Sequence, residues 1–172
     1  MFVLSDSFPE ANRRHYFFML EGLREIEAAL KKRGLKFVCV NSSPEKAVVD
    51  FAHDASLVIT DRGYLRIQKL WRSAVASNLR CPLIQVESDV VIPVETASAK
   101  EEYAAATLRP KIEKLLDNFL TPLRERKPEI SSLNLKFDSL DLSNPLFLLQ
   151  RMKFSDDIEN SKTMTGGIIA AE

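Results

Sequence analysis

Charged and aromatic side chains crowd together in the segment SAKEEYAAATLRPKIEKLLDNFL, from Ser98 to Leu120. The groups that could do chemistry there are Lys100, Glu101, Glu102, Tyr103 and Arg109. A tyrosine can stack on or hydrogen-bond a planar group, and a lysine can neutralise an acidic substituent. The same side chains would also suit the solvated face of a helix, so the two interpretations stay open at this point.

Other residues give weaker signals of a catalytic or binding site. Asp61 follows a predicted strand, where doubly wound folds bind ligands, but it could equally cap a turn or a helix. Asp6 has the same ambiguity. His15 lies on an amphipathic helix, far in sequence from His53, and is expected to be a partly buried structural residue. The sequence has no GxGxxG, P-loop lysine, HExxH or CxxC motif. Spacing therefore assembles neither a nucleophile–base pair nor a metal cluster.

The elements that must position these residues are visible as four short apolar runs: Phe2–Leu4, Lys36–Val40, Leu57–Thr60 and Leu83–Val86. Nearly continuous runs of β-branched and aromatic residues are typical of parallel strands that are covered on both faces. Helical patterns alternate with them, over about Asn12–Arg33, in SSPEKAVVDFAHD and over Leu65–Asn78. This alternation predicts βαβ crossovers and an α/β fold with a Rossmann-like, doubly wound parallel sheet.

Glycine and proline residues predict where the helices begin and end. Gly34 follows the first helix, where a left-handed cap is wanted, and Pro44 suits the first turn of the second, with Ser43 before it as a cap. A further helix is predicted over about Thr107–Leu120. Because Pro110 is tolerable only in a first turn, this helix is expected to begin near Leu108 or Arg109.

Beyond Leu120 the pattern changes, and residues 121–172 are predicted to be mainly an irregular linker. The stretch TPLRERKPEISSLNLKFDSLDLSNP has three prolines and little periodicity. A short helix is expected after it, capped by Asn144 with Pro145 at its first position. At the end of the chain, Gly166 and Gly167 precede IIAAE, which looks like the first turn of a helix.

Composition excludes several classes of protein. The net charge is zero, with 24 basic and 24 acidic residues, which argues against nonspecific nucleic-acid binding driven by overall charge. Cys39 and Cys81 lie in or beside apolar runs and are expected to be buried free thiols, without a disulfide framework or a zinc site. No apolar run approaches the ~20 residues of a membrane helix, and MFVLSDSFPE has no secretory pattern. A cytoplasmic location is expected, or a nuclear or organellar one in a eukaryote.

Three segments in a fixed order carry a family resemblance: RHYFFMLEGLREIEAAL, VITDRGYLRIQKLWRSAVA and QVESDVVIPVETASAKEEYAAATLRPKI. They resemble the N-terminal α/β domain of the class II cyclobutane pyrimidine dimer photolyases, over roughly Arg13 to Leu120. TGGIIAAE also resembles the Gly-Gly-x-x-A-A that opens the flavin domain of that family. Some matched positions depart from the family pattern: Tyr64, Glu87, Asp89, Val90, Ala99 and Ala106.

The resemblance implies a light-driven DNA repair lyase, in which a C-terminal helical domain holds flavin adenine dinucleotide (FAD) and the flipped-out dimer. The N-terminal domain of the family holds, or once held, an antenna chromophore, either a deazaflavin or a folate. By this resemblance residues 1–120 form the antenna-type domain without the first strand of the family, and residues 121–172 lead to a flavin domain. Asp61, Lys100 and Tyr103 become candidates for antenna contacts. In the alternative interpretation, Tyr103 packs the loop, while Lys100 and Arg109 tie two domains together.

The leading functional interpretation is a photolyase-like N-terminal domain that is not catalytic alone and binds no cofactor by itself. Repair needs the flavin as electron donor, and a protein contributes by positioning it against the substrate. Pyrimidine-dimer DNA is then a partner of the full-length family only, and no membrane or metal partner is expected. Two alternatives stay open: an independent nucleotide- or flavin-binding module, and an interaction domain that complements a separate flavin-domain chain.

Overall fold

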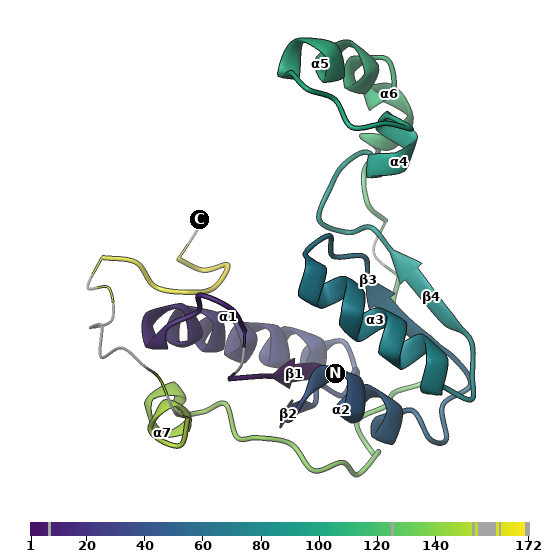
Figure 1. Ribbon diagram of the computed structural model, residues 1–172. Coiled ribbons are helices and arrows are strands. Elements are labelled where there is room, and N and C mark those ends of the chain that lie inside the picture. Colours follow the sequence, from purple (N-terminus) through teal and green to yellow (C-terminus); the bar gives the residue numbers. More distant parts are fainter. Residues whose placement is uncertain (7, 125, 153, 155–160, 162, 171–172) are drawn as a thin grey trace. The chain divides into compact units, whose positions relative to one another are not determined.

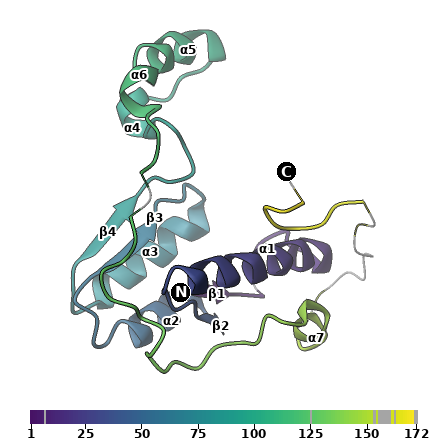
Figure 2. The same ribbon diagram turned by 180° about the vertical axis from the view of Figure 1, so that it is seen from behind.

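The computed structural model describes residues 1–6, 8–124, 126–152, 154, 161 and 163–170 (Figure 1). The strands are β1 (Phe2–Leu4), β2 (Cys39–Asn41), β3 (Val58–Asp61) and β4 (Leu83–Val86). The helices are α1 (Arg13–Lys32), α2 (Pro44–Phe51), α3 (Arg66–Asn78), α4 (Val94–Ala97), α5 (Ala105–Glu113), α6 (Leu116–Phe119) and α7 (Pro145–Gln150). Each predicted strand is present, although the second begins at Cys39 rather than at Lys36. Figure 2 shows the same elements from behind.

Both strand pairs are parallel, as the alternation of strands and helices predicted. β1 pairs with β2 with Phe2 opposite Cys39, and β3 pairs with β4 with Val58 opposite Leu83. In the described part of the chain, these ladders make two sheets of two strands each. The mixed α/β fold with parallel strand pairs confirms the predicted Rossmann-like class, and the apolar run Phe2–Leu4 is in a sheet, as expected.

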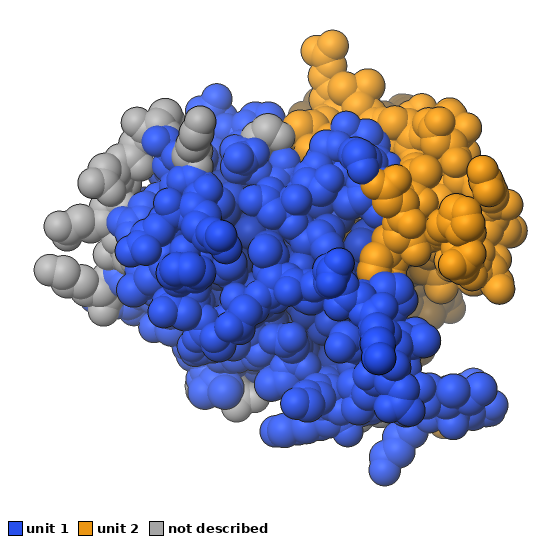
Figure 3. All heavy atoms as spheres, turned by 90° about the horizontal axis from the view of Figure 1, so that it is seen from below, with its two compact units in different colours: residues 1–47, 126–172 blue, residues 48–125 orange. Residues whose placement is uncertain are grey.

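The chain divides into two compact units, which Figure 3 shows in different colours. Unit 1 contains residues 1–47 and 126–172, and unit 2 contains residues 48–125. The main hydrophobic core belongs to unit 1 and joins α1, the β1–β2 sheet and α7. Its buried members are Leu4, Tyr16, Leu20, Leu23, Phe37, Cys39, Leu142, Leu148, Leu149 and Met152. Unit 2 buries fewer apolar side chains, including Ala52, Val75 and Ile92.

Part of the predicted linker forms hydrogen bonds with β2 and with the chain that leads into it. The Ser132 N–H donates to the Gly34 carbonyl at 2.9 Å, and the Lys36 N–H donates to Ser132 Oγ at 2.8 Å. Further along, the Leu140 N–H donates to the Cys39 carbonyl at 2.7 Å. Residues 132–140 therefore satisfy backbone groups beside β2, and the residues that follow them contribute side chains to the core of unit 1.

Most of the expected helix caps are present in the structure. The Asn12 side chain caps α1 by accepting from the N–H groups of Arg14 and His15, and His15 Nδ1 accepts from the Asn12 N–H at 3.2 Å. His15 is thus structural, as expected, although it is exposed rather than partly buried. Gly34 has a φ of 79°, in the left-handed region. Asn144 caps α7, and Pro145 is the first residue of that helix.

The expected start of the helix near Leu108 or Arg109 was wrong. α5 begins at Ala105, so Pro110 lies inside it. The Ala104 carbonyl accepts from the N–H groups of Thr107 and Leu108 and also from the Thr107 hydroxyl, at 2.8 Å. These bonds begin the helix one turn earlier than the proline suggested. A proline removes only one intrahelical hydrogen bond, and α5 ends at Glu113, less than one turn later.

Both cysteines are free thiols, and Cys39 is buried as predicted, whereas Cys81 is only half-buried because it lies in the loop before β4. The helices within the described residues are all too short or too polar to cross a membrane.

Candidate functional site

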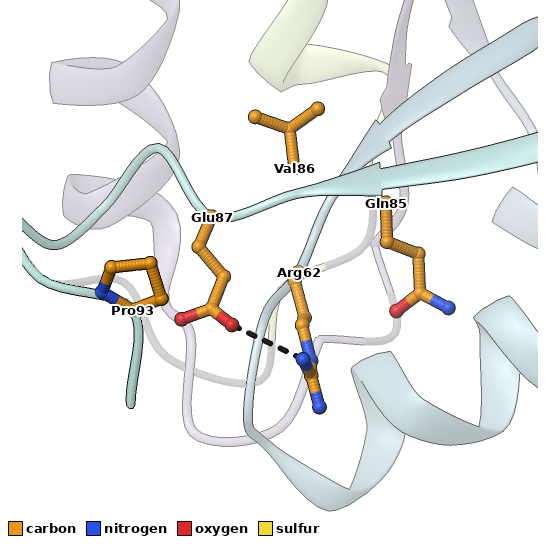
Figure 4. Close-up of a pocket in the computed structure, with 5 residues that line it drawn as sticks. All are labelled: Arg62, Gln85, Val86, Glu87 and Pro93. Carbon is orange, nitrogen blue, oxygen red and sulfur yellow. Dashed lines mark hydrogen bonds and ion pairs between the residues drawn. The ribbon is translucent and has the colours of Figure 1, made fainter. Parts of the chain in front are cut away.

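A pocket of about 600 Å³ lies at the carboxyl ends of β3 and β4 in unit 2 (Figure 4). It is lined by Arg62, Gln85, Val86, Glu87 and Pro93. Because side chains alternate along a strand, Gln85 and Glu87 project toward Arg62, while Val86 projects to the opposite side. The carboxyl edge of a parallel sheet is where doubly wound folds place their ligands, so this pocket is the natural place to look for a site.

The Arg62 guanidinium is held by two carboxylates. Its Nη1 donates to Glu87 Oε1 at 3.1 Å and to Glu95 Oε2 at 3.2 Å, and its Nη2 bonds the other oxygen of Glu95. The Arg62 backbone N–H also donates to the Val86 carbonyl, at 2.8 Å, which extends the β3–β4 ladder. The arginine therefore joins the loop after β3 to the loop after β4 through both its backbone and its side chain.

Glu87 is the more enclosed partner, with a side chain 9% exposed against 31% for Arg62. Its Oε2 accepts from the Val94 N–H at 2.8 Å. The pKa of the Glu87 carboxyl is lowered, first by a hydrogen bond from the Tyr64 hydroxyl and then by the Val94 N–H and the Arg62 charge. The Arg62 guanidinium also lies over the Tyr64 ring, 5.8 Å from its centre. Glu87 is consequently ionised and fixed at neutral pH.

The charge of this cluster decides what the pocket could bind. One guanidinium faces two carboxylates, which leaves one net negative charge on the three side chains. Gln85 is also engaged, because its Oε1 accepts from Arg72 Nε at 3.2 Å. The pocket therefore has no spare positive charge from Arg62 to attract an acidic ligand, and its polar groups mainly hold the surrounding loops together.

The three predicted antenna contacts do not line this pocket in the described part of the chain. Asp61 is the last residue of β3 and accepts a hydrogen bond from the Ser88 hydroxyl. Lys100 and Tyr103 lie in the loop between α4 and α5, and both are exposed. One interpretation expected Tyr103 to pack the loop. Its side chain is 92% exposed, so that interpretation was wrong. No two of the three are joined by a hydrogen bond or ion pair in that part of the structure.

The same loop holds a polar cluster that sequence reasoning missed. Lys111 Nζ donates to Glu102 Oε1 at 2.5 Å and to Ser98 Oγ at 3.0 Å, while the Ser98 hydroxyl donates to Glu102 at 2.7 Å. Hydrogen bonds from Lys111 first and then from Ser98 lower the pKa of the Glu102 carboxyl to about 2. This cluster ties the loop before α5 to the helix itself, so much of the polar chemistry of the segment is structural.

The described residues do not form a metal-binding cluster. Within the ranges that the structure describes, no group of three or more histidine, cysteine, aspartate or glutamate side chains is close enough to hold an ion. The carboxylates of Glu87 and Glu95 are already engaged, both by Arg62 and Glu87 also by the Val94 N–H and the Tyr64 hydroxyl. The arrangement suits binding or loop positioning better than bond cleavage.

Comparison with known proteins places the chain in a family. The sequence profile named DNA photolyase matches residues 1–129. The chain belongs to the DNA photolyase family. The deoxyribodipyrimidine photo-lyase of Methanothermobacter thermautotrophicus is 50% identical over 142 residues, which are 83% of this chain and 30% of that protein. The photolyase family inferred from the three sequence segments is thus confirmed.

More distant relatives carry the same printed name. The deoxyribodipyrimidine photo-lyase of Potorous tridactylus is 34% identical over 124 residues, covering 70% of this chain and 23% of that protein. That of Arabidopsis thaliana is 30% identical over 132 residues, covering 74% of this chain and 27% of that protein. The chain therefore spans less than a third of the length of these photolyase relatives.

Proposed function

We propose that this chain is the N-terminal α/β domain of a class II photolyase-like protein, whose longer form repairs cyclobutane pyrimidine dimers in DNA by light. The observation that carries the proposal is the 50% identity with the Methanothermobacter deoxyribodipyrimidine photo-lyase over most of the chain. The three ordered segments that resemble the class II pattern favour that class. A cytoplasmic location, or a nuclear or organellar one in a eukaryote, stays part of the proposal.

FAD would supply the electron for repair in the longer protein. The pocket at Arg62 is too open to bury a dinucleotide, because it lies at the end of a two-stranded sheet. The chain alone is accordingly proposed to bind no flavin. Its own contribution is a folded domain against which a flavin-binding region can be held.

An antenna chromophore fits the Arg62 pocket poorly. A deazaflavin or folate with acidic substituents would need a free cation, and the Arg62 charge is already paired with Glu87 and Glu95. Lys100 and Tyr103 are exposed on another loop, where they could contact a chromophore only with further protein around them. We assign no antenna step to this pocket, and Asp61, Lys100 and Tyr103 stay proposed contacts.

The test of the proposal is a repair assay on the purified chain. With added FAD, reductant and blue light, this chain should leave the dimers in ultraviolet-irradiated DNA intact. The Methanothermobacter relative, assayed in parallel, serves as the positive control. Loss of dimers that requires both light and this chain would overturn the proposal of a non-catalytic domain.

A second candidate is an interaction domain that complements a separate flavin-domain chain. Unit 2 exposes large apolar side chains on its α5–α6 region, with Leu120 68% and Leu123 98% exposed, in addition to Tyr103. Side chains this exposed are accessible to another protein, and contiguous apolar patches are typical of surfaces that other protein covers. Co-expression with the C-terminal part of the Methanothermobacter relative should then give a complex that Leu123→Ser weakens. Separate elution of the two chains would count against this candidate.

A further inference from the structure

The segment around Gly166 and Gly167 lies against α1 within unit 1 and is held by carboxylates. The Gly166 N–H donates to Glu21 Oε2 at 2.9 Å. The N–H groups of Ile168 and Ile169 both donate to Glu25 Oε2, at 2.6 and 3.2 Å. Three backbone donors of one turn thus bond two side chains that lie about 145 residues away in sequence.

The spacing of the two glutamates explains how α1 presents this site. Residues four apart lie on the same helix face, one turn above the other, so Glu21 and Glu25 can reach successive N–H groups of one turn. Hydrogen bonds from backbone N–H groups to a carboxylate are charge-assisted and stronger than those between neutral groups. The recognition therefore uses the backbone of the bound segment rather than its side chains.

The contact also requires glycine in the bound segment. A Cβ at Gly166 would lie 1.8 Å from the Phe18 carbonyl oxygen, which is a backbone atom that cannot move aside. Gly167 has a φ of 119°, which L-residues rarely adopt, and a Cβ there would lie 2.3 Å from the Glu25 carboxylate. Only a pair of glycines lets the turn approach α1 this closely.

On the α1 side of the contact, a glycine is not required. A Cβ at Gly22 would lie 3.6 Å from the Gly167 nitrogen, an ordinary van der Waals distance. The contact therefore requires glycine at two positions of the turn, whereas α1 contributes only its two carboxylates and could carry a larger residue at Gly22. This asymmetry distinguishes recognition of a specific turn from general close packing, and it makes the site testable with single-methyl changes.

We propose that Glu21 and Glu25 form an anchor site on α1 that selects a Gly-Gly turn, with residues 166–169 of the same chain as its ligand. The anchor fixes the backbone from which Ile168 and Ile169 project, and these side chains are 64% and 78% exposed. It thus presents two apolar side chains outward in a set direction. This inference stands on contacts within unit 1 and does not depend on the proposed function.

The test measures amide exchange of Gly166, Ile168 and Ile169 by NMR in the full chain. Glu25→Ala should speed exchange at Ile168 and Ile169 by about tenfold or more, as expected when charge-assisted bonds are lost. Glu25→Gln keeps an acceptor oxygen and should restore part of the protection. Glu27→Gln is the matched control, because its side chain projects from a different face of α1.

Two alanine variants keep the test decisive if a glutamate variant perturbs α1. Gly166→Ala should release the segment although both carboxylates remain, whereas Gly22→Ala should leave it bound. Exchange in the Leu20 and Leu23 region of α1 reports whether the fold is intact. Unchanged exchange at residues 166–169 in both Glu25→Ala and Gly166→Ala would overturn the anchor site, as would release by Gly22→Ala.

Discussion

The Cys39 N–H donates to Ser139 Oγ at 3.0 Å, although the two residues are 100 positions apart in sequence. This bond marks the place where residues 126–172 complete unit 1. The side chains that follow it fill the core around β1 and β2, and Leu142 is only 1% exposed there. The C-terminal stretch is therefore needed for the stability of unit 1.

Leu142→Ala should lower the free energy of unfolding of unit 1 by about 2–5 kcal/mol, because a buried leucine leaves a cavity when it is truncated. Chemical denaturation followed by the fluorescence of a reporter in unit 1 measures this change. Leu135→Ala is the matched control: Leu135 is 52% exposed, and its truncation should cost less than about 0.5 kcal/mol. Equal effects of the two variants would show that this stretch contributes no core.

Gly22→Ala should stabilise the chain by about 0.5–1 kcal/mol, because glycine inside a helix carries an entropic cost that alanine avoids. Gly22 lies in the middle of α1, and its added methyl would meet the Gly167 backbone only at van der Waals distance. Denaturant midpoints of the variant and the parent chain provide the measurement. A destabilised variant would mean that α1 and the glycine turn approach each other more closely than this.

Glu102→Gln should lower the melting temperature of unit 2 at neutral pH by a few degrees, because Lys111 loses its ionic partner. The folded pKa of about 2 lies below the ordinary carboxyl value of 4.5, so the contribution of Glu102 is fully present above pH 4.5 and is lost as the pH falls toward 2. Melting curves from pH 7 to pH 2 should therefore converge for the two proteins at the acidic end. A constant difference across this range would argue against the ion pair.

Arg62→Met should open the loop that follows β4, because Glu87 keeps its charge in an enclosed position without its cation. The Val94 N–H, which donates to Glu87, is the local reporter. Its amide exchange should become faster, while exchange within α3 stays unchanged. Arg66→Met, at an exposed position in the first turn of α3, is the control and should leave Val94 protected.

Binding of the isolated chain to duplex DNA should be weak and steeply dependent on salt. Its 24 basic residues are balanced by 24 acidic ones, and nonspecific affinity at physiological salt is typically 10⁻⁴–10⁻⁶ M. Fluorescence anisotropy with intact and ultraviolet-irradiated duplexes, over a range of salt concentrations, measures it. Binding of either duplex much tighter than about 1 µM would reveal a basic surface that overall charge conceals.

Local patterns predicted the regular elements well because those elements depend on neighbouring residues. The apolar runs at Phe2–Leu4 and Leu83–Val86 are strands, and the spacing of Tyr16, Leu20 and Leu23 placed the buried face of α1. The start of α5 was predicted wrongly from Pro110, because a proline does not need to lie in the first turn of a helix. The Ala104 carbonyl accepts the bonds that begin this helix. The pairing of residues 132–140 with β2 and the chain before it has no periodic signal, so it could not be predicted.

The candidate site was harder to predict than the fold, because it depends on which polar groups satisfy one another. Tyr103 and Lys100 attracted notice by residue type, yet Glu102 and Lys111 make the strongest contacts of that segment. Likewise Arg62 follows Asp61 directly, but its pairing with Glu87 and Glu95 requires knowledge of two loops. The opposite charges of Arg62 and of Glu87 and Glu95 are visible in the sequence, but nothing in it indicates which of them pair.

Because unit 1 is built from residues 1–47 and 126–172, the whole of unit 2 is inserted between its two parts. During synthesis from the amino end, α1 and β1 leave the ribosome well before the residues that complete their core. At a synthesis rate of about 5–20 residues per second, the time between the synthesis of α1 and that of α7 is on the order of 6–25 s. Unit 2 can fold in that interval, whereas the apolar face of α1 stays uncovered. Newly made chains are thus most exposed to chaperones and to aggregation through α1, until Leu142, Leu148 and Leu149 emerge.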